Sequence, residues 1–324
     1  MSAPPPPAPG RPRGPPAALF LTFVFLVGTF FRAQVLQYSD YALRSEGNRL
    51  REIPLPAPRG MIVDRRGAII AENVPGYAVS IIVPGVDSLR TVLDRVASVI
   101  PLSEAQVDEA VRRFRRNANR PTVILGNATF DLVSRLEEHR LLFPGLIIQE
   151  APKRFYPDGP AVSAFVGYTG EVSEDELTTP PFAGYKSGQQ VGKSGIERQY
   201  EGRLRGTEGV RFVEVDARGR VVREADSSTT VLPEAAPRLA TNIDLDLQRY
   251  VASIFGDSLV GAAVALDPAT GAVLALHSAP GFDPNRFIGG IPAGYYRQLL
   301  DDPHRPLYNK ATQGRFAPGS TWKL

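Results

Sequence analysis

The last residues of the chain place a serine and a lysine three positions apart. Ser320 and Lys323 follow a Pro-Gly pair, where a helix can begin, and positions i and i+3 share one face of a helix. The hydroxyl of Ser320 could therefore meet the amine of Lys323, as nucleophile and base meet in S-x-x-K enzymes that form an acyl-serine. The spacing alone has a structural alternative, with Ser320 as a helix N-cap and Lys323 as an exposed helical residue.

Other common site chemistries find little support in the composition. The chain has no cysteine, which excludes a disulfide framework and a thiolate metal site. Its three histidines, His139, His277 and His304, are isolated from one another in the sequence and match no metal-ligand spacing. We assign none of them to a site.

The net positive charge of the chain comes from its beginning. The formal net charge is +3, and residues 1–36 contain three arginines and no acidic residue. The remaining residues therefore balance to zero, whereas a nucleic-acid-binding domain needs a basic face on its folded part. The arginine-rich run at 112–116 is better explained as the solvated side of a helix. We expect no nucleic-acid partner.

The N-terminal segment has the features of a membrane anchor. Residues 1–14 are rich in proline and should form a disordered cytoplasmic tail. Residues 15–36 are almost free of charge, and a helix over 17–36 would be about 30 Å long, the thickness of a bilayer's hydrocarbon core. Arg11 and Arg13 precede this segment, so the positive-inside rule leaves the N-terminus in the cytoplasm and the bulk of the chain outside. A cleaved signal peptide is the alternative, but bulky and charged residues follow the apolar run.

Residues 37–236 show a mixed pattern of helices and strands. Short apolar runs on both sides of Asp64–Gly67 predict a tight hairpin, and a second hairpin is predicted around Asp216–Gly219. Ile196, Tyr200 and Leu204 recur at every fourth position, which predicts an amphipathic helix. Three further helices are expected near Ser88–Ile100, Ser103–Arg116 and Phe130–Glu138.

Residues 237–324 follow a loop of low hydrophobicity and read as the start of a second domain. A strand at Leu239–Ile243 and a helix at Asp244–Phe255 come first. Two apolar strands, Ala262–Leu266 and Ala272–Leu276, are then joined by a turn containing Pro and Gly. With the helix expected from Ser320, this order predicts an incomplete α+β sandwich.

The stretch Asn309–Lys323 resembles the first active-site motif of the class B penicillin-binding proteins. Other landmarks of that family occur upstream in the same order, and they are Arg59–Asn73, Arg154–Pro157, Val166–Gly170, Gly192–Gly206 and Asp267–Gly271. The resemblance implies an α+β protein with an N-terminal transmembrane helix, a mixed α/β pedestal domain and the first part of a serine β-lactamase-like transpeptidase domain. Phe282–Asn285 and Pro306–Gly314 resemble the elongation type more than the septal type.

The resemblance also implies a reaction, a location and partners. Ser320 would attack the stem peptide of peptidoglycan as nucleophile of a D,D-transpeptidase, and Lys323 would act as general base, with no cofactor or metal. β-Lactams would acylate the same hydroxyl. The protein would lie in the cytoplasmic membrane, in contact with the lipid bilayer, and would work with the glycosyltransferase and scaffold proteins of an elongation complex.

The family's second and third motifs, S-x-N and K-T-G, do not occur after Lys323. Without them nothing would cover Lys323 or lower its pKa, so we expect the 324-residue chain to be catalytically inactive. Two alternatives stay open: a membrane-anchored interaction module without catalysis, and a β-lactam sensor or serine β-lactamase.

Overall fold

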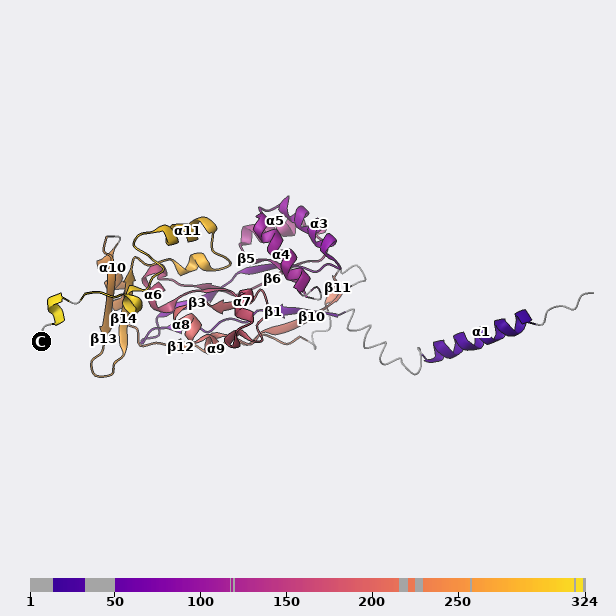
Figure 1. The fold of residues 1–324 in the computed structure, drawn as a ribbon, viewed down its shortest axis with the longest axis horizontal. Coiled ribbons are helices and arrows are strands. Elements are labelled where there is room, and N and C mark those ends of the chain that lie inside the picture. Colours follow the sequence, from indigo (N-terminus) through magenta and orange to yellow (C-terminus); the bar gives the residue numbers. More distant parts are fainter. Residues whose placement is uncertain are drawn as a thin grey trace, which may run out of the picture. The chain divides into compact units, whose positions relative to one another are not determined.

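The structure is a computed structural model, and it describes residues 14–32, 50–116, 118, 120–215, 221–224, 230–256, 258–317 and 319–322 (Figure 1). The chain divides into two units, Met1–Arg51 and Glu52–Leu324, which we treat one at a time. The fold of the second unit is α+β, as predicted.

The first unit contains the helix α1 (Gly14–Phe31). Its side chains from Phe20 to Phe31 are exposed and carry no charge. Among the described residues, no helix combines the length and the apolar character that crossing a bilayer requires. The membrane anchor over 15–36 therefore stays a prediction, and residues 1–13 of the expected tail lie outside the described residues.

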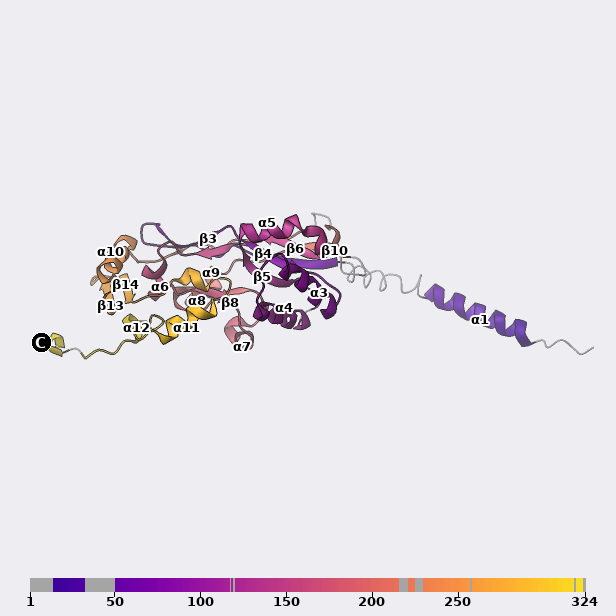
Figure 2. The same ribbon diagram turned by 90° about the horizontal axis from the view of Figure 1, so that it is seen from above.

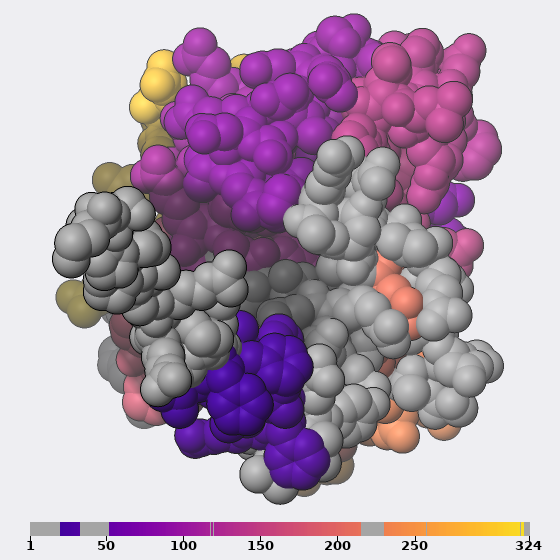
Figure 3. Space-filling view, turned by 90° about the vertical axis from the view of Figure 1, so that its right-hand side faces the viewer, coloured from indigo at the N-terminus to yellow at the C-terminus, as the bar shows by residue number. Residues whose placement is uncertain are grey.

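One part of the second unit is a helical lobe, defined here as residues 77–150. Its central strand β4 (Tyr77–Ile81) pairs antiparallel with β5 (Thr122–Ala128) and with β6 (Leu146–Glu150). The helices of the lobe are α3 (Val86–Ala97), α4 (Glu104–Arg116), α5 (Phe130–Glu138) and η2 (Arg140–Leu142). Figure 1 shows α3, α4 and α5 on one side of this sheet, Figure 2 shows them from above, and Figure 3 shows α3 and α4 (purple) beside α5 (pink) on the surface.

The helices of the lobe follow from their apolar spacing. Leu89, Leu93 and Val96 lie on one face of α3 and are fully buried, as positions i, i+4 and i+7 of a helix must be to share a core. Phe114 of α4 and Leu136 of α5 complete the same apolar cluster. The three helices predicted from the sequence are thus confirmed, with small differences at their ends.

A second sheet joins distant parts of the chain in the order β12-β2-β3-β7. The strands β2 (Ile62–Val63) and β3 (Ile69–Val74) form the predicted hairpin, and Gly67 in its turn has a φ of 90°, which favours glycine. β7 (Lys153–Phe155) pairs with β3. β12 (Leu239–Ala240) pairs parallel with β2. It is shorter than the strand predicted over 239–243.

The rest of the region up to residue 236 is built from short elements. The strands are β8 (Thr169–Glu171) paired with β9 (Gln190–Gly192), and β1 (Leu50–Leu55) beside β10 (Gly209–Val215) and β11 (Val221–Glu224). The helices are η3 (Gly159–Ala161), α6 (Ser163–Val166), α7 (Glu174–Leu177), η4 (Pro180–Phe182), α8 (Gly195–Gln199) and α9 (Glu201–Leu204). The second predicted hairpin is confirmed as β10 and β11, and its turn lies outside the described residues.

One sequence prediction in this region is wrong. The single amphipathic helix through Ile196, Tyr200 and Leu204 is broken at Tyr200, which separates α8 from α9. Tyr200 is 40% exposed, whereas the carboxylate-bearing residues Glu197 and Glu201 are buried. The buried side of this segment therefore includes two carboxylates beside Leu204, and apolar periodicity could not locate them.

The C-terminal part contains α10 (Leu245–Phe255) and the hairpin of β13 (Gly261–Leu266) with β14 (Val273–Ala279), both as predicted. The short elements η6 (Pro284–Phe287), α11 (Ala293–Asp301), α12 (Lys310–Gln313) and η7 (Gly319–Trp322) follow. Tyr250, Ile254, Val264 and Leu266 leave an apolar surface exposed on α10 and β13.

Candidate functional site

Ser320 lies on η7, a single 3-10 turn, and its side chain is exposed. The sequence predicted an α-helix beginning here; the structure has the tighter turn instead, entered through Gly319 at a φ of 55°. In Figures 1 and 2 this yellow segment extends away from the hairpin of β13 and β14. Lys323 lies outside the described residues, so its predicted meeting with Ser320 stays a prediction.

The segment that leads to Ser320 is fixed at α12. Asn309 caps this helix: its side-chain oxygen accepts hydrogen bonds from the backbone N–H groups of Ala311 (3.1 Å) and Thr312 (3.3 Å). The side-chain nitrogen of Asn309 donates to the carbonyl oxygen of Ala164 in α6, at 2.6 Å. A single amide thus joins the chain before Ser320 to a helix of the region assigned to the pedestal.

Lys310 is the buried cation of this segment. Its backbone N–H donates to Oγ of Ser278 (3.0 Å), and its Nζ donates to the carbonyl oxygen of Arg305 (3.1 Å). Burial lowers the pKa of Lys310, partly offset by the charge of Asp302. Arg305 has a φ of 51°, a left-handed conformation that the bond from Lys310 helps to hold.

Residues from three of the segments that resemble the family form a buried ion-pair network, defined here as Arg59, Arg154, Glu197 and Glu201. Nε of Arg59 lies 2.6 Å from Glu197 Oε2, and Nη2 of Arg59 lies 2.6 Å from Glu201 Oε2. Nε of Arg154 lies 2.7 Å from Glu197 Oε1. The side chain of Glu197 is fully buried. Two arginines therefore balance two carboxylates away from water.

Backbone and tyrosine groups complete the network. Gly192 N–H donates to Glu201 Oε2 (2.7 Å), and the hydroxyl of Tyr185 donates to Glu201 Oε1 (2.7 Å). Burial alone would raise the pKa of Glu201, but the hydrogen bonds and charge of Arg59 lower it. Burial, together with the bond to Glu201, raises the pKa of Tyr185 to about 12. Both groups stay in their usual charge states at neutral pH, so the network is structural.

Three polar side chains fasten the region after 237 to the region before it. Asp64 Oδ2 accepts from the N–H of Leu245 at the first turn of α10 (3.2 Å). Asn285 donates to the carbonyl oxygen of Tyr156 and accepts from its N–H, both at 2.9 Å. Gln248, fully buried, donates to the carbonyl oxygen of Ala161 (2.7 Å). Residues 52–324 consequently form one compact unit; the predicted domain border at 236/237 stays a prediction.

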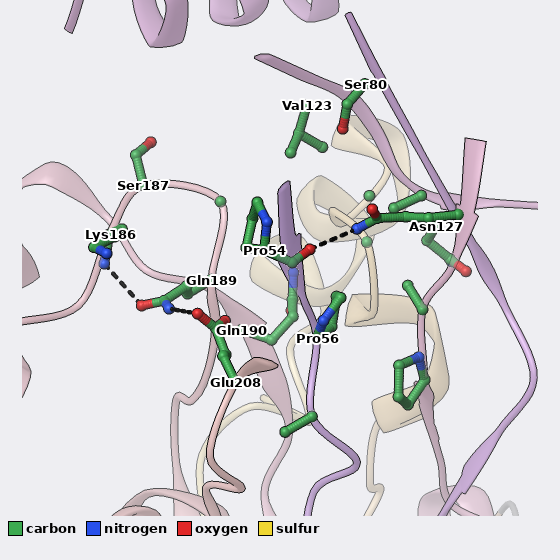
Figure 4. Close-up of a pocket in the computed structure, with 18 of the residues that line it drawn as sticks. Pro54, Pro56, Ser80, Val123, Asn127, Lys186, Ser187, Gln189, Gln190 and Glu208 are labelled. Atoms are coloured by element: carbon green, nitrogen blue, oxygen red, sulfur yellow. Dashed lines mark hydrogen bonds between the residues drawn. The ribbon is translucent and has the colours of Figure 1, made fainter. Parts of the chain in front are cut away.

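A cavity of about 270 Å³ lies beside the ion-pair network. Pro54 and Pro56 face Ser80, Val123 and Asn127 of the helical lobe across it, and the loop at 186–190 with Glu208 closes another side (Figure 4). Gln149 donates to the carbonyl oxygen of Pro54 (3.0 Å), while its Oε1 is buried and unpaired within the described residues. A bound molecule that donates a hydrogen bond at this position would therefore find an unused acceptor.

Comparison with known proteins places this architecture in a family. The penicillin-binding protein dimerisation domain matches residues 54–233, which include all four residues of the ion-pair network. The chain belongs to the penicillin-binding proteins. The family's transpeptidase domain matches residues 261–324 and includes Ser320.

Several known proteins are similar to the chain in sequence. The chain is 36% identical over 311 residues to the peptidoglycan D,D-transpeptidase MrdA of Escherichia coli K12, covering 94% of this chain and 48% of the relative. Identity to MrdA of Haemophilus influenzae is also 36%, over 314 residues with the same two coverages, and identity to FtsI of E. coli is 27%. The chain spans about half the length of the curated relatives it matches.

A solved structure supports the fold. The complex between penicillin-binding protein PBP2 and MreC from Helicobacter pylori aligns with a TM-score of 0.63 and 26% identity, covering 80% of this chain and 48% of that one.

Sequence reasoning named the network's residues as family landmarks without finding their role. Arg59 and Glu197 are separated by 138 positions, so no local pattern links them. The only local signal was the pair Glu197 and Glu201, two acids four positions apart in a segment that otherwise looked amphipathic. Asn309, Asn285 and Asp64 were likewise missed as connections between regions.

Proposed function

We propose that this chain is part of a peptidoglycan D,D-transpeptidase that works through an acyl-serine at Ser320. The observation that carries the proposal is the match of the transpeptidase domain over 261–324, directly after a dimerisation-domain match and with Ser320 in the S-x-x-K position. MrdA relatives that carry this function by name support it. The higher identity to MrdA than to FtsI favours the elongation type over the septal type.

In this proposal the reaction has two halves. Oγ of Ser320 attacks the carbonyl carbon between the two terminal D-Ala residues of a stem peptide, and Lys323 accepts the hydroxyl proton. The peptide C–N bond breaks, the terminal D-Ala leaves with a proton on its nitrogen, and an ester to Ser320 remains. An amine of a neighbouring strand then attacks the ester, forms the cross-link and returns the hydroxyl. A β-lactam enters the first half only, because its opened ring does not leave.

Labelling by a fluorescent penicillin tests this function in the full-length protein. We expect one label per chain at Ser320, loss of the label in Ser320→Ala, and slow labelling in Lys323→Ala. Mass spectrometry of the labelled peptide identifies the site. A label that persists in Ser320→Ala, or that maps elsewhere, contradicts the acyl-serine assignment.

The membrane anchor over 15–36 belongs to the same proposal. The uncharged sequence of α1 and the arginines before it support a single-pass anchor in the cytoplasmic membrane, with the bulk of the chain extracytoplasmic. Because the chain has no cysteine, a single introduced cysteine reports topology cleanly. An impermeant maleimide should label Ser173→Cys in intact spheroplasts and should leave Ser2→Cys unlabelled. The reverse pattern would refute the orientation.

We also propose a scaffold protein as a partner of the region before residue 237. A solved relative is described as a complex with MreC, and the cavity bounded by Pro54, Val123 and the loop at 186–190 offers a docking position. A purified scaffold partner should bind the wild-type chain. Binding should weaken at least tenfold in Val123→Arg, which fills the cavity with a charge, and should be unchanged in the exposed control Val231→Arg.

A further inference from the structure

We propose that Asn309 is a positioning residue for acylation: its side-chain amide fixes the segment leading to Ser320 on the helix α6. This inference rests on the acyl-serine function proposed above and adds a residue that does not itself touch the reacting atoms. It assigns a functional coupling to the contact between the region after 237 and the region before it.

The oxygen and the nitrogen of the Asn309 side chain make hydrogen bonds to different helices. The oxygen caps α12 by accepting from Ala311 and Thr312 N–H groups, which have no partner within the helix. The nitrogen donates to the carbonyl oxygen of Ala164 at 2.6 Å, one of the terminal carbonyls of the four-residue helix α6. Among the side chains favoured at the N-cap, only that of asparagine has its acceptor and its donor on two separate atoms. A carboxylate would keep the cap and lose the bond to α6.

α6 is a firm support for this bond. Val162, Phe165 and Val166 are buried in the apolar cluster that also holds Ile62, Tyr156 and Leu204. Gly167 follows α6 at a φ of 75°, and a Cβ there would overlap the backbone of Ser194. The helix therefore cannot shift without disturbing α8 and, through Glu197, the ion-pair network.

Asn309 belongs to the last anchored turn before Ser320. Lys310 N–H bonds to Ser278, and Tyr308 Oη donates to the carbonyl oxygen of Gln313. From Arg315 to Ala317 and at Ser320, the described residues are exposed and make no side-chain hydrogen bond or ion pair. The position of Ser320 is thus set by the direction in which the chain leaves α12, and a rotation of α12 on α6 moves the hydroxyl.

The substitution Asn309→Asp tests the donor role of the amide separately from its capping role. Aspartate is as good an N-cap as asparagine, so α12 is kept, while its carboxylate faces the Ala164 carbonyl without a donor. The matched control is Asn285→Asp, which removes a donor bond of the same kind, at 2.9 Å to the Tyr156 carbonyl, but lies 35 positions before Ser320 in the sequence.

The measurement is the acylation of the full-length protein by a fluorescent penicillin, divided into the binding constant Ks and the acylation rate constant k2. We expect Asn309→Asp to lower k2 about tenfold with Ks changed less than twofold, because the hydroxyl is misplaced relative to a bound acyl group. Asn285→Asp should leave k2 within twofold of the wild type. Thermal unfolding of both variants records any general loss of stability.

Each outcome decides the matter. A wild-type k2 in Asn309→Asp, or an equal fall in both variants, overturns the positioning role while leaving the acyl-serine function intact. Absence of labelling at Ser320 in the wild type overturns the proposed function and this inference with it. If Asn309→Asp does not fold, Asn309→Gly, which is tolerated at an N-cap position and has no side-chain donor for the Ala164 carbonyl, is expected to give the same tenfold fall.

Discussion

The ion-pair network and the Ser320 segment place their polar side chains in opposite surroundings, one buried and one exposed to solvent. Glu197 is fully buried and makes bonds to Arg59, Arg154 and Tyr156, whereas Ser320 is exposed on a short turn. Buried charges must be paired to persist, and each partner depends on the others. We therefore expect the buried network to stabilise the fold, and the exposed hydroxyl of Ser320 to contribute little to it.

The comparison predicts that stability resides in the network. Glu197→Ala leaves two arginines without their shared carboxylate, and we expect the free energy of unfolding of the 324-residue chain to fall by about 3–5 kcal/mol. Denaturant unfolding followed by circular dichroism measures it. The matched control is Glu174→Ala, which removes an exposed partner of Arg116 and should cost about 0–1 kcal/mol. Equal losses in the two variants would erase the distinction between network and surface.

The network also depends on a close approach of backbone at Gly192. A Cβ at this position would overlap the carbonyl of Glu197, and the N–H of Gly192 bonds to Glu201. We expect Gly192→Ala to lower the free energy of unfolding by about 2–3 kcal/mol through overpacking. Gly202→Ala adds the same methyl group within α9, where nothing lies within 4 Å, and should be neutral or slightly stabilising. A neutral Gly192→Ala would mean that the backbone around Glu197 yields easily.

The sequence predicted the local elements well and their assembly poorly. The helices α3 to α5, the hairpin at 62–74 and α10 all follow from apolar period and capping residues, which are short-range signals. The pairing of β12 with β2 and the contact of Arg59 with Glu197 join residues far apart in the chain. Their partners are chosen by tertiary packing, so no window of sequence contains them.

The Ser320 segment shows a different limit. The motif predicted a nucleophile and its base, but an α-helix from Ser320 requires packing that a single exposed turn does not provide. The structure has a 3-10 turn there. Motif recognition thus located the residue that we propose as nucleophile, while local geometry at that residue could not be predicted from the motif.

Asp64 joins the hairpin at 62–74 to α10, and its contribution to stability is expected to lie between those of the ion-pair network and Ser320. Its carboxylate accepts from the N–H groups of Arg66, Ala68 and Leu245. Burial opposes ionisation, but these backbone hydrogen bonds lower the pKa of Asp64. The folded state therefore binds the proton less tightly than the unfolded state, so the contribution is present above the unfolded pKa of about 4 and is lost as pH falls through the folded value.

Asp64→Asn tests this linkage. Asparagine keeps one acceptor for the hairpin and loses the acceptor for Leu245, so we expect a loss of about 1–2 kcal/mol at pH 7 that shrinks below about pH 4 as the wild-type carboxylate is protonated. Unfolding free energies of both proteins between pH 7 and pH 3 measure it. Asp94→Asn, at an exposed position of α3, is the control. A difference between wild type and variant that is constant with pH would contradict the role of the charge.

The smallest expected effect lies at the serine itself. Ser320→Ala removes an exposed hydroxyl from a single turn, and we expect the free energy of unfolding to change by less than about 0.5 kcal/mol, although acylation of the full-length protein is lost. A stability loss near that of Glu197→Ala would mean that Ser320 is held by the fold and would remove the contrast with the network. If stability is unchanged, the hydroxyl of Ser320 makes no measurable contribution to the fold, and its proposed role is confined to acylation.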